Sequence, residues 1–539
     1  MEAPAAAPDR AATLLAAASR LAAWVASASV CCALGYHVLR GSNAHLGLFE
    51  DDYFYYAAIA DRLVTTGRLT YDGVTQTNGF HPLWLLLLAA LRAVFGRFGP
   101  GFYLALLAVF FSAMVATYEL SVGFARELGA TARQAPVIAA AYSLGTARLL
   151  SCGMEAALAV PLLLLFLRET ARQRPLTPRR AAALGMLASV AILARLDIAL
   201  AVFLLIAGWL ALARPSFSSA WRTLLAFFAG GVLVPAYAAA NWLAFGSVLP
   251  MSALAKRLQR VPGFNLNYAR AVALATVYGP VVGVVLPLGL ASWFLLARAR
   301  PAARPAALAT GGLTIVFALT FYFLNALSGW VYFGWYAYPL APALIAATVF
   351  LCRRWIPEKG KGVAAALAAA VLVLVPLSAA RYFVEHGPRW TVADNSMLAM
   401  SLELKRRMGG REGLVGMGAI AGIAAHVLDR PVFQLEGVVG DRALIEHIRR
   451  EAPLGSLLKD RGVDYLIVTL ANEAAVVRDG CYLITQPNPR WSGNRVARMR
   501  GEICAEPVEH FSTPAGQNPW STFPLLETLV FDLRGARWR

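Results

Sequence analysis

The chain has 539 residues, of which 58% are hydrophobic and only 15% are charged, and its mean hydropathy is +0.57. A soluble globular protein is about 45–50% apolar and about 25% charged, so the composition excludes an ordinary soluble protein. The formal net charge is +18, from 49 Lys and Arg residues against 31 Asp and Glu residues. Because these cations cluster in short connections between apolar blocks and no RNA- or DNA-binding motif accompanies them, they indicate membrane topology, and we expect no nucleic-acid partner.

Long apolar blocks follow one another from about residue 20 to residue 382. Each holds roughly 15–25 residues, the length that a helix needs to cross a hydrocarbon core of ~30 Å. We therefore predict a polytopic α-helical membrane protein with about eleven transmembrane helices. The predicted spans cover residues 20–39, 101–123, 134–150, 155–168, 181–194, 198–213, 223–245, 271–297, 305–327, 336–351 and 363–382.

The apolar block at 82–96 is only about 15 residues long and contains an Arg, which favours a re-entrant or interfacial segment over a span. With this assignment, the segments richest in Arg and Lys, such as 168–180, all lie on one side of the membrane, which the positive-inside rule makes the cytoplasm. The N-terminus is then inside, and the loop at 40–100 and the tail from residue 383 onward are outside. A high Ala and Arg content indicates a GC-rich bacterial genome, so the predicted location is the bacterial inner (plasma) membrane.

The tail at 383–539 is predicted to form a soluble extracytoplasmic α/β domain, separate from the transmembrane catalytic domain at 1–382. Predicted strands at 411–418, 431–437 and 463–470 alternate with predicted helices at 419–428, 441–450 and 455–462. This alternation indicates a partly parallel sheet. From about residue 480 the chain is predicted to be loop-rich. If the tail is extracytoplasmic, Cys481 and Cys504 can form a disulfide.

A glycine-rich turn in this tail matches a dinucleotide-binding fingerprint, because it follows a predicted strand, opens a predicted helix and has an acidic residue, Glu436, about 20 residues further on. The turn contains Gly416, Gly418, Ala421 and Gly422. The predicted topology places it outside the cell, where NAD is scarce, and the same turn serves any tight strand-to-helix packing. We therefore expect no dinucleotide there.

The sharpest chemical feature is the segment at 49–84, which opens with three consecutive acids, Glu50, Asp51 and Asp52, directly after the first predicted span. Acids beside a membrane are costly unless they have a function or reach water. A carboxylate placed there can remove the proton from an attacking sugar hydroxyl. The alternative is a solvated helix N-terminus, where capping and the helix dipole favour Asp.

This pattern of an acidic pair, an aromatic run and a loop that ends in His81-Pro82-Leu83-Trp84 resembles the GT-C superfamily of polyprenyl-phosphate-sugar glycosyltransferases. The superfamily includes protein O-mannosyltransferases, aminoarabinose transferases acting on lipid A, rhizobial lipopolysaccharide transferases and mycobacterial arabinofuranosyltransferases. In these enzymes the first extracytoplasmic loop holds a catalytic Asp that acts as general base. The resemblance places this role on Asp51, with Asp52 beside it, and leaves open which of the two acts.

Shorter matches follow in order along the membrane half. The segment at 152–158 resembles the second acidic motif of the outer face, which implies that Glu155 lies near the site, although it can instead cap the next helix. Arg195, in a segment that resembles the family's Arg-x-Asp turn, can hold phosphate or form a structural ion pair with Asp197. Lys256, in a segment that resembles a later outer loop, is the candidate for the donor phosphate, with an ordinary loop charge as the alternative.

Aromatic and histidine side chains complete the predicted site. His81 can polarise a substrate or anchor the loop before Pro82, and we favour the anchor. Tyr55 and Tyr336 can stack on sugar, but each is also explained by an aromatic belt at the membrane interface. No certain cofactor is implied. Glu155 orients the site or binds a divalent cation, and metal dependence varies within the superfamily.

The resemblance implies an inverting glycosyltransferase that moves a sugar from a polyprenyl-phosphate donor to an envelope glycan, glycolipid or protein acceptor. One alternative is a transporter or flippase for a lipid-linked sugar. Transporters often show inverted repeats and place ionisable residues near the midplane, whereas the acids here cluster at one face and no repeat is visible. A second alternative is a non-catalytic envelope-assembly protein with the same fold.

Overall fold

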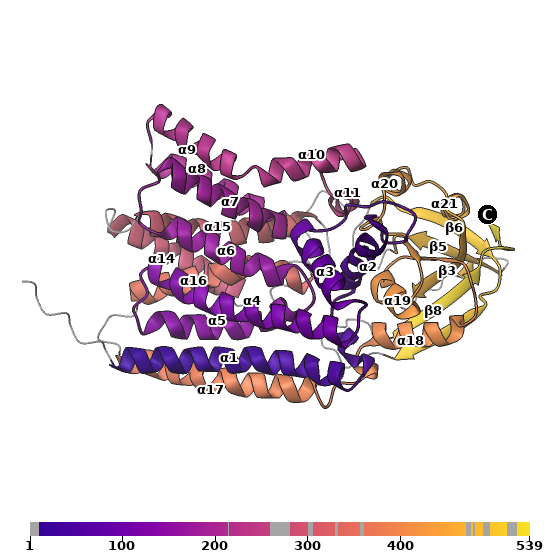
Figure 1. The fold of residues 1–539 in the computed structure, drawn as a ribbon, viewed down its shortest axis with the longest axis horizontal. Coiled ribbons are helices and arrows are strands. Elements are labelled where there is room, and N and C mark those ends of the chain that lie inside the picture. Colours follow the sequence, from indigo (N-terminus) through magenta and orange to yellow (C-terminus); the bar gives the residue numbers. More distant parts are fainter. Residues whose placement is uncertain are drawn as a thin grey trace, which may run out of the picture.

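The computed structural model describes residues 10–213, 215–258, 281–299, 305–328, 333–355, 361–470, 476–477, 480–488, 496–514 and 525–538. A bundle of long helices forms one part of the molecule, and strands and short helices from the C-terminal part of the chain form the other (Figure 1). Two shorter helices, α2 (Asp51–Thr66) and α3 (Pro82–Phe95), lie between them. The predicted active-site loop is therefore at the junction of the two parts.

Each predicted span overlaps a helix in the described part of the bundle. These helices are α1 (Arg10–Leu39), α4 (Pro100–Glu127), α5 (Gln134–Ser151), α6 (Ala156–Ala171), α7 (Pro178–Ala194), α8 (Ile198–Ala213), α9 (Phe217–Gly230), α10 (Leu233–Phe245), α14 (Leu286–Ala299), α15 (Pro305–Ser328), α16 (Leu340–Trp355) and α17 (Lys361–His386), with a π-helical turn, η2 (Val281–Val285), before α14. By length and hydropathy, 4 of the described helices qualify as membrane spans, or 5 if one bent pair counts as a single span. The polytopic class is thus supported, and the total of eleven stays a prediction.

The predicted span at 223–245 falls on α9 and α10, which together are long and apolar enough for one span but are bent by 55°. Glycine explains the position of the bend. A Cβ at Gly230 would lie 2.0 Å from the carbonyl oxygen of Ala182 on α7, and a Cβ at Gly185 would lie 1.9 Å from the carbonyl oxygen of Phe227. Small residues let two helix backbones approach this closely, and glycine is also a weak helix former.

The apolar block at 82–96 forms α3, a helix of 14 residues. At ~1.5 Å per residue, such a helix is about 21 Å long, which is shorter than a hydrocarbon core of ~30 Å. Proline at its first position, Pro82, has no N–H to leave unsatisfied and so starts the helix cleanly. Its length and its place beside α2 (Figure 1) fit the predicted interfacial segment.

Arginine side chains at the ends of α6 and α16 contact the end of α4. The guanidinium of Arg172, after α6, pairs with Glu127 at the end of α4, with 3.4 Å from Nε to Oε1. Arg353, in the last turn of α16, donates to the carbonyl oxygen of Leu128 at 2.6 Å. The basic segments at the ends of α6 and α16 thus lie together beside the end of α4, and their assignment to the cytoplasmic side stays a prediction.

The C-terminal part contains a five-stranded sheet in the order β2-β1-β3-β8-β7. β1 (Leu414–Met417) pairs in parallel with β2 (Val432–Gln434) and β3 (Val463–Leu470), whereas β8 (Leu525–Asp532) is antiparallel to both β3 and β7 (Glu509–Pro514). The predicted partly parallel sheet is confirmed. The helices of this part are α18 (Ser396–Met408), α19 (Ala421–Leu428), α20 (Arg442–Arg449) and α21 (Leu454–Asp460).

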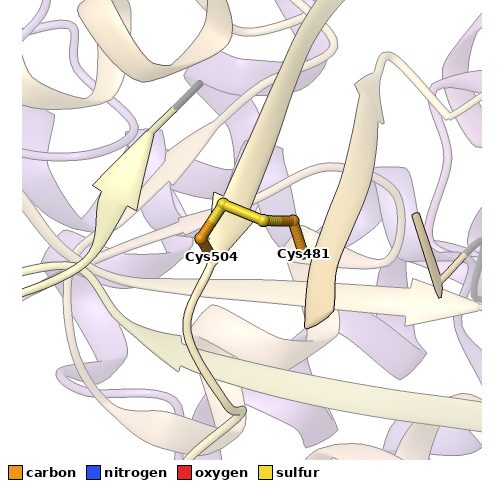
Figure 2. Close-up of a disulfide and its surroundings, with 2 residues drawn as sticks. All are labelled: Cys481 and Cys504. Atoms are coloured by element: carbon orange, nitrogen blue, oxygen red, sulfur yellow. A yellow bond between two sulfur atoms is a disulfide. The ribbon is translucent and has the colours of Figure 1, made fainter. Parts of the chain in front are cut away.

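The prediction that the chain is loop-rich after residue 480 is wrong. A second sheet, in the order β4-β5-β6-β9, combines β4 (Val476–Val477), β5 (Cys481–Gln486), β6 (Met499–Cys504) and β9 (Arg537–Trp538). Acids, glycine and arginine in β6 hide the strand pattern in the sequence. Cys481 and Cys504 lie opposite each other at the ends of β5 and β6 and form a disulfide (Figure 2), which is the pairing that the sequence left open.

The two parts share one hydrophobic core that continues from the bundle through α2 into β1 and α19. Side chains from beyond α17 also bond to the loop after α1. The indole of Trp390 donates to the carbonyl oxygen of Ala44 at 3.2 Å, and the amide of Asn395 donates to that of Gly47 at 2.7 Å. These two hydrogen bonds fix the loop that leads from α1 into α2.

Candidate active site

Asp51 and Asp52 form the first turn of α2, immediately after the N-cap residue Glu50. Acidic residues are stabilised at this position by the helix dipole. Both carboxylates are partly exposed, whereas the four aromatic residues that follow them, 53–56, are buried. The aromatic run therefore anchors α2 in the core and leaves the acids at its accessible end.

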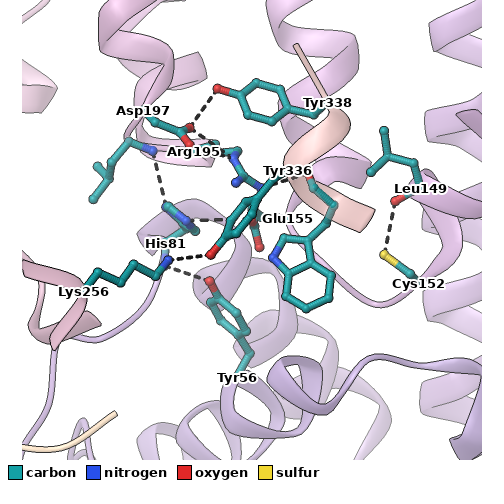
Figure 3. A network of polar contacts seen from close by, with 12 residues as sticks. Tyr56, His81, Leu149, Cys152, Glu155, Arg195, Asp197, Lys256, Tyr336 and Tyr338 are labelled. Atoms are coloured by element: carbon teal, nitrogen blue, oxygen red, sulfur yellow. Dashed lines mark hydrogen bonds and ion pairs between the residues drawn. The ribbon is translucent and has the colours of Figure 1, made fainter. Parts of the chain in front are cut away.

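Side chains from segments far apart in the chain meet in one polar network, which includes His81, Glu155, Arg195, Lys256 and Tyr336 (Figure 3). Arg195, between α7 and α8, is at the centre and is 1% exposed. Its Nη1 atom lies 2.5 Å from Glu155 Oε1, and its Nε atom lies 3.1 Å from Asp197 Oδ1. The hydroxyl of Tyr338 also donates to Asp197 at 2.8 Å. The predicted ion pair between Arg195 and Asp197 is present and is part of a larger buried network.

Glu155 is 1% exposed. It occupies the N-cap position of α6, but its side chain makes no capping hydrogen bond, so the capping alternative is wrong. One carboxylate oxygen, Oε1, pairs with Arg195 and lies 3.7 Å from His81 Nε2. The other, Oε2, is buried and has no hydrogen-bond partner among the residues that the structure describes. A buried carboxylate oxygen is costly to leave unpaired, so Oε2 is available for a donor group of a substrate.

His81 lies at the start of α3 and joins two loops. Its Nδ1 atom accepts a hydrogen bond from the backbone N–H of Leu196 at 3.3 Å. Burial, together with the nearby Arg195 guanidinium, lowers the pKa of His81 to about 3, so the ring is neutral at pH 7. Because Nδ1 accepts, the proton of the neutral ring is on Nε2, which faces Glu155. This geometry fits the anchoring role favoured from the sequence.

Lys256, in the last turn of α11 (Met251–Arg257), is the second cation of the site. Its Nζ atom donates to the hydroxyl of Tyr336 at 2.7 Å and lies 5.1 Å from the centre of that ring. The guanidinium of Arg195 lies 5.3 Å from the same ring. One tyrosine thus separates two cations that reach it from different loops. The neighbouring Arg257 is exposed.

The two carboxylates of α2 differ in their surroundings. Burial raises the pKa of Asp52 to about 8, and the carboxylate of Asp51 raises it as well, whereas the Lys256 ammonium lowers it. Burial raises the pKa of Asp51 only to about 6, because the backbone N–H of Ile423 bonds to its charged form. A general base works best when its pKa is near the operating pH, and both carboxylates fit this condition, so the choice between them rests on their contacts.

The two tyrosines predicted to contact sugar lie in different places. Tyr55 is 4% exposed, and its ring packs edge-on against Tyr71 with 5.1 Å between the ring centroids. This favours a structural role for Tyr55. Tyr336 borders the two cations described above and packs at a tilt against Trp335, with 5.9 Å between their centroids. Of the two, Tyr336 joins the network of Arg195 and Lys256, whereas Tyr55 bonds to Asp51.

No protein-family model and no curated protein sequence matches this chain. Its structure is similar to a crystal structure of ArnT from Cupriavidus metallidurans bound to undecaprenyl phosphate, with a TM-score of 0.51 and 14% sequence identity, over 96% of this chain and 97% of that chain. Both are built on the GT-C fold. The resemblance predicted from the sequence is thereby confirmed at the level of the fold.

Two further solved structures are similar at lower scores. ArnT from the same organism in the apo state has a TM-score of 0.48 and 16% identity, over 77% of this chain and 87% of that chain. The oligosaccharyltransferase of Archaeoglobus fulgidus in the apo form has a TM-score of 0.47 and 11% identity, over 82% of this chain and 69% of that chain.

Three residues of this candidate site were not predicted as site residues. Tyr338 and Asp197 belong to the buried network, and both stand inside segments that the sequence did single out. Glu436, after β2, is close enough to raise the pKa of Asp52, although it comes from the distant C-terminal part. Within the described ranges, no three His, Cys, Asp or Glu side chains are grouped as metal ligands, and a divalent cation stays a prediction.

Proposed function

We propose that this protein is a membrane glycosyltransferase that moves a sugar from a polyprenyl-phosphate donor to a hydroxyl of an envelope glycan, glycolipid or protein, with inversion at the anomeric carbon. The carrying observation is the placement of an accessible carboxylate, Asp52, beside the Lys256 ammonium, whose charge lowers the carboxylate's pKa. A base and a phosphate-binding cation are the two groups that this transfer needs. The ArnT structure that shares the fold holds undecaprenyl phosphate, which supports a lipid phosphate as the donor's carrier.

The reaction uses side chains of two loops. The carboxylate on α2 removes the proton of the acceptor hydroxyl while the hydroxyl oxygen attacks the anomeric carbon. The bond from that carbon to the phosphate oxygen breaks, and the polyprenyl phosphate leaves with the electron pair. Lys256 stabilises the negative charge on the departing phosphate, because a cation held near a developing charge lowers the barrier.

Arg195 has a different role in this scheme. It is 1% exposed and is already paired with two carboxylates, Glu155 and Asp197. A buried guanidinium with two anionic partners holds its neighbours in place, so we assign the positioning of Glu155 and Tyr336 to Arg195. The free oxygen of Glu155, Oε2, then accepts a hydrogen bond from a sugar hydroxyl.

The membrane location belongs to the same proposal. The disulfide between Cys481 and Cys504 supports an oxidising compartment for the C-terminal part, because disulfides persist outside the cytosol. The active-site end of the bundle is on the same side as that part (Figure 1). We therefore place the site on the periplasmic or outer face of the inner membrane, with the N-terminus in the cytoplasm.

The test measures transfer from radiolabelled polyprenyl-phosphate sugars to total envelope acceptor by purified protein. We expect wild-type transfer from one donor in a panel, a loss of about 10²–10⁴-fold in Asp52→Asn, the expected contribution of a general base, and a raised KM for donor in Lys256→Ala. Arg257→Ala is the matched control, because it removes an exposed charge from the neighbouring position. Folded wild-type protein that transfers no sugar from any donor would refute the proposal and favour a transport or assembly role.

A further inference from the structure

The first acid of α2 bonds to a helix at the far end of the chain. Oδ1 of Asp51 accepts a hydrogen bond from the backbone N–H of Ile423 at 2.7 Å, and Oδ2 accepts from that of Gly422 at 3.4 Å. These N–H groups belong to the first turn of α19, which has no partner for them within the helix. The N-cap residue of α19 is Ile420, which has no polar side chain to offer. Asp51 therefore supplies the cap that the local sequence lacks.

The backbones also fit closely at this contact. A Cβ at Gly422 would lie 2.3 Å from the carbonyl oxygen of Asp51, so glycine alone fits here without a shift of one backbone. The hydroxyl of Tyr71, in the loop between α2 and α3, donates to the carbonyl oxygen of Ala421 at 2.7 Å. Further along α19, the ring of His426 packs against Phe54 with 5.1 Å between centroids. The glycine-rich turn and α19 are thus held against α2 and the loop after it by these three contacts.

This docking explains the glycine-rich turn that resembles a dinucleotide fingerprint. In such a fingerprint, the N-terminus of the helix holds a phosphate and the second glycine lets the backbone approach it. Here the anion at the helix N-terminus is the carboxylate of Asp51. At Gly418, a Cβ would lie 2.4 Å from the side-chain oxygen of Gln486, so protein atoms surround this glycine too.

Asp52 is placed differently although it is the next residue. Within the described ranges, its carboxylate has no hydrogen-bond or ion-pair partner, and the charges near it are Asp51, Lys256, Glu155 and Glu436. The charged form of Asp51 is stabilised by the two backbone N–H groups and by a hydrogen bond from Tyr55, which disfavour its protonation. The neighbouring carboxylate keeps its lone pairs for a substrate.

From this difference we propose that Asp51 is a positioning residue that couples the C-terminal part to the active-site loop, and that Asp52 alone acts as the base. The inference rests on the proposed function and names the residue that carries its proton step. The Asp52 carboxylate takes the hydroxyl proton and becomes a carboxylic acid. The bond from the hydroxyl oxygen to the anomeric carbon forms as the bond from that carbon to phosphate breaks, and the phosphate keeps the electron pair.

Paired substitutions separate the two roles. Asp51→Asn keeps an oxygen that accepts from the Ile423 N–H, whereas Asp51→Ala removes both acceptors. We expect Asp51→Asn to keep kcat within about tenfold of wild type and Asp51→Ala to lose more, while Asp52→Asn loses the full contribution of a base, about 10²–10⁴-fold. A kcat in Asp51→Asn that is as low as in Asp52→Asn would overturn the assignment.

A second variant tests the contact between α2 and α19 by a change on α19. Gly422→Ala places a methyl group against the Asp51 backbone and leaves both carboxylates intact. We expect it to reduce kcat as Asp51→Ala does. Gly535→Ala is the control, because a Cβ there meets nothing within 4 Å. Equal activity in Gly422→Ala and the control would contradict the coupling.

Hydrogen exchange tests the coupling without any transfer assay. In folded protein, Asp51→Ala should speed exchange of the Gly422 and Ile423 amides by about ten- to hundredfold, the value of a hydrogen bond to a charged group, and Asp51→Asn by less. Unchanged exchange in Asp51→Ala would refute the coupling whatever the activity. Faster exchange in a wild-type-like fold, with no transfer by wild-type protein, would keep the coupling and refute the enzymatic function.

Discussion

Lys256 and Tyr336 are 80 positions apart in the chain, and the ammonium group of one lies 2.7 Å from the phenolic oxygen of the other. The hydrogen bond joins a short helix of one loop to the aromatic segment before α16. It holds the cation beside the carboxylate of Asp52, whose pKa it lowers. The position of the Lys256 ammonium relative to Asp52 is therefore set by a contact between two separate loops.

Removal of the Tyr336 hydroxyl tests this arrangement. Tyr336→Phe keeps the ring beside Lys256 and Arg195 but removes the hydrogen bond to Nζ. We expect the KM for donor to rise by about five- to tenfold, as for the loss of a hydrogen bond of about 1–1.5 kcal/mol, with a smaller change in kcat. Lys256→Ala should raise the KM further. Tyr482→Phe, on β5 of the second sheet, is the aromatic control, and an equal rise in KM there would contradict the special position of Tyr336.

The pH dependence of transfer follows from the raised pKa of Asp52. Because a base must be ionised, kcat/KM should rise with pH and level off above about 8. The charges that act on this group are Asp51 on its own helix, Lys256 on α11, Glu155 before α6 and Glu436 after β2. Lys256→Met should move the rising limb to higher pH, since the cation that favours the ionised form is lost. If kcat/KM did not change between about pH 6 and 9, a range that brackets the expected pKa of about 8, Asp52 would be excluded as the base.

The same shift has a consequence for stability. A carboxyl group whose pKa is higher in the folded than in the unfolded state stabilises the fold fully below the unfolded value, and this contribution is lost as the pH rises through the folded value of about 8. The melting temperature of the wild-type protein should therefore fall as the pH rises from about 6 to about 9. Asp52→Asn should lose less over the same range. Thermal melts in one detergent at each pH compare the two proteins, and parallel losses would argue against a raised pKa.

The buried pair of Glu155 and Arg195 predicts strong coupling between two substitutions. Each side chain is 1% exposed, so Glu155→Gln leaves a guanidinium with one carboxylate fewer, and Arg195→Met leaves a carboxylate without its cation. Either change should destabilise the fold by about 3–5 kcal/mol. The double variant should be less destabilised than the sum of the two single ones, because no buried charge is left alone between these positions. Additive losses in denaturation of all four proteins would contradict a direct pair.

The disulfide offers a test of both stability and topology. Cys481 and Cys504 close a loop with a sequence separation of 23, for which the entropy of the unfolded chain predicts a loss of about 3 kcal/mol in the Cys481→Ser/Cys504→Ser variant. In intact cells, these two cysteines should resist a membrane-impermeant maleimide until a reductant is added. Labelling without reductant would mean that the pair is open, and no labelling after reduction would place the C-terminal part inside.

Much of the site could be predicted from the sequence. Glu155, Arg195, Lys256 and Tyr336 each stand in a short segment next to an apolar block, and such segments at one end of a helix bundle must meet. Apolar block length was enough to locate the helices, because the hydrocarbon core sets a minimum length for every span. The assignment of one end to the cytoplasm from its basic connections stays a prediction. The acidic pair was recognisable because charged residues are rare beside a membrane.

Other features depend on contacts that no local pattern records. Asp51 accepts a hydrogen bond from Ile423, which is 372 positions away. The residues around the acidic pair therefore could not show whether each acid caps a helix or acts as a base. The bend between α9 and α10 arises where Gly230 meets α7, which is a tertiary contact. The strands after residue 480 are held by pairing and a disulfide, and their own composition is a weak guide.

The docking of α19 on α2 also sets an order of events during biosynthesis. The loop that holds Asp51 and Asp52 follows the first helix, so it emerges early from the ribosome, whereas Ile423 follows more than three hundred residues later. A nascent chain that has inserted all its helices still has an uncapped α19 and an untethered acidic loop until its final segment has been translocated and folded. The acidic turn therefore reaches its folded arrangement only after the C-terminal part has folded onto it.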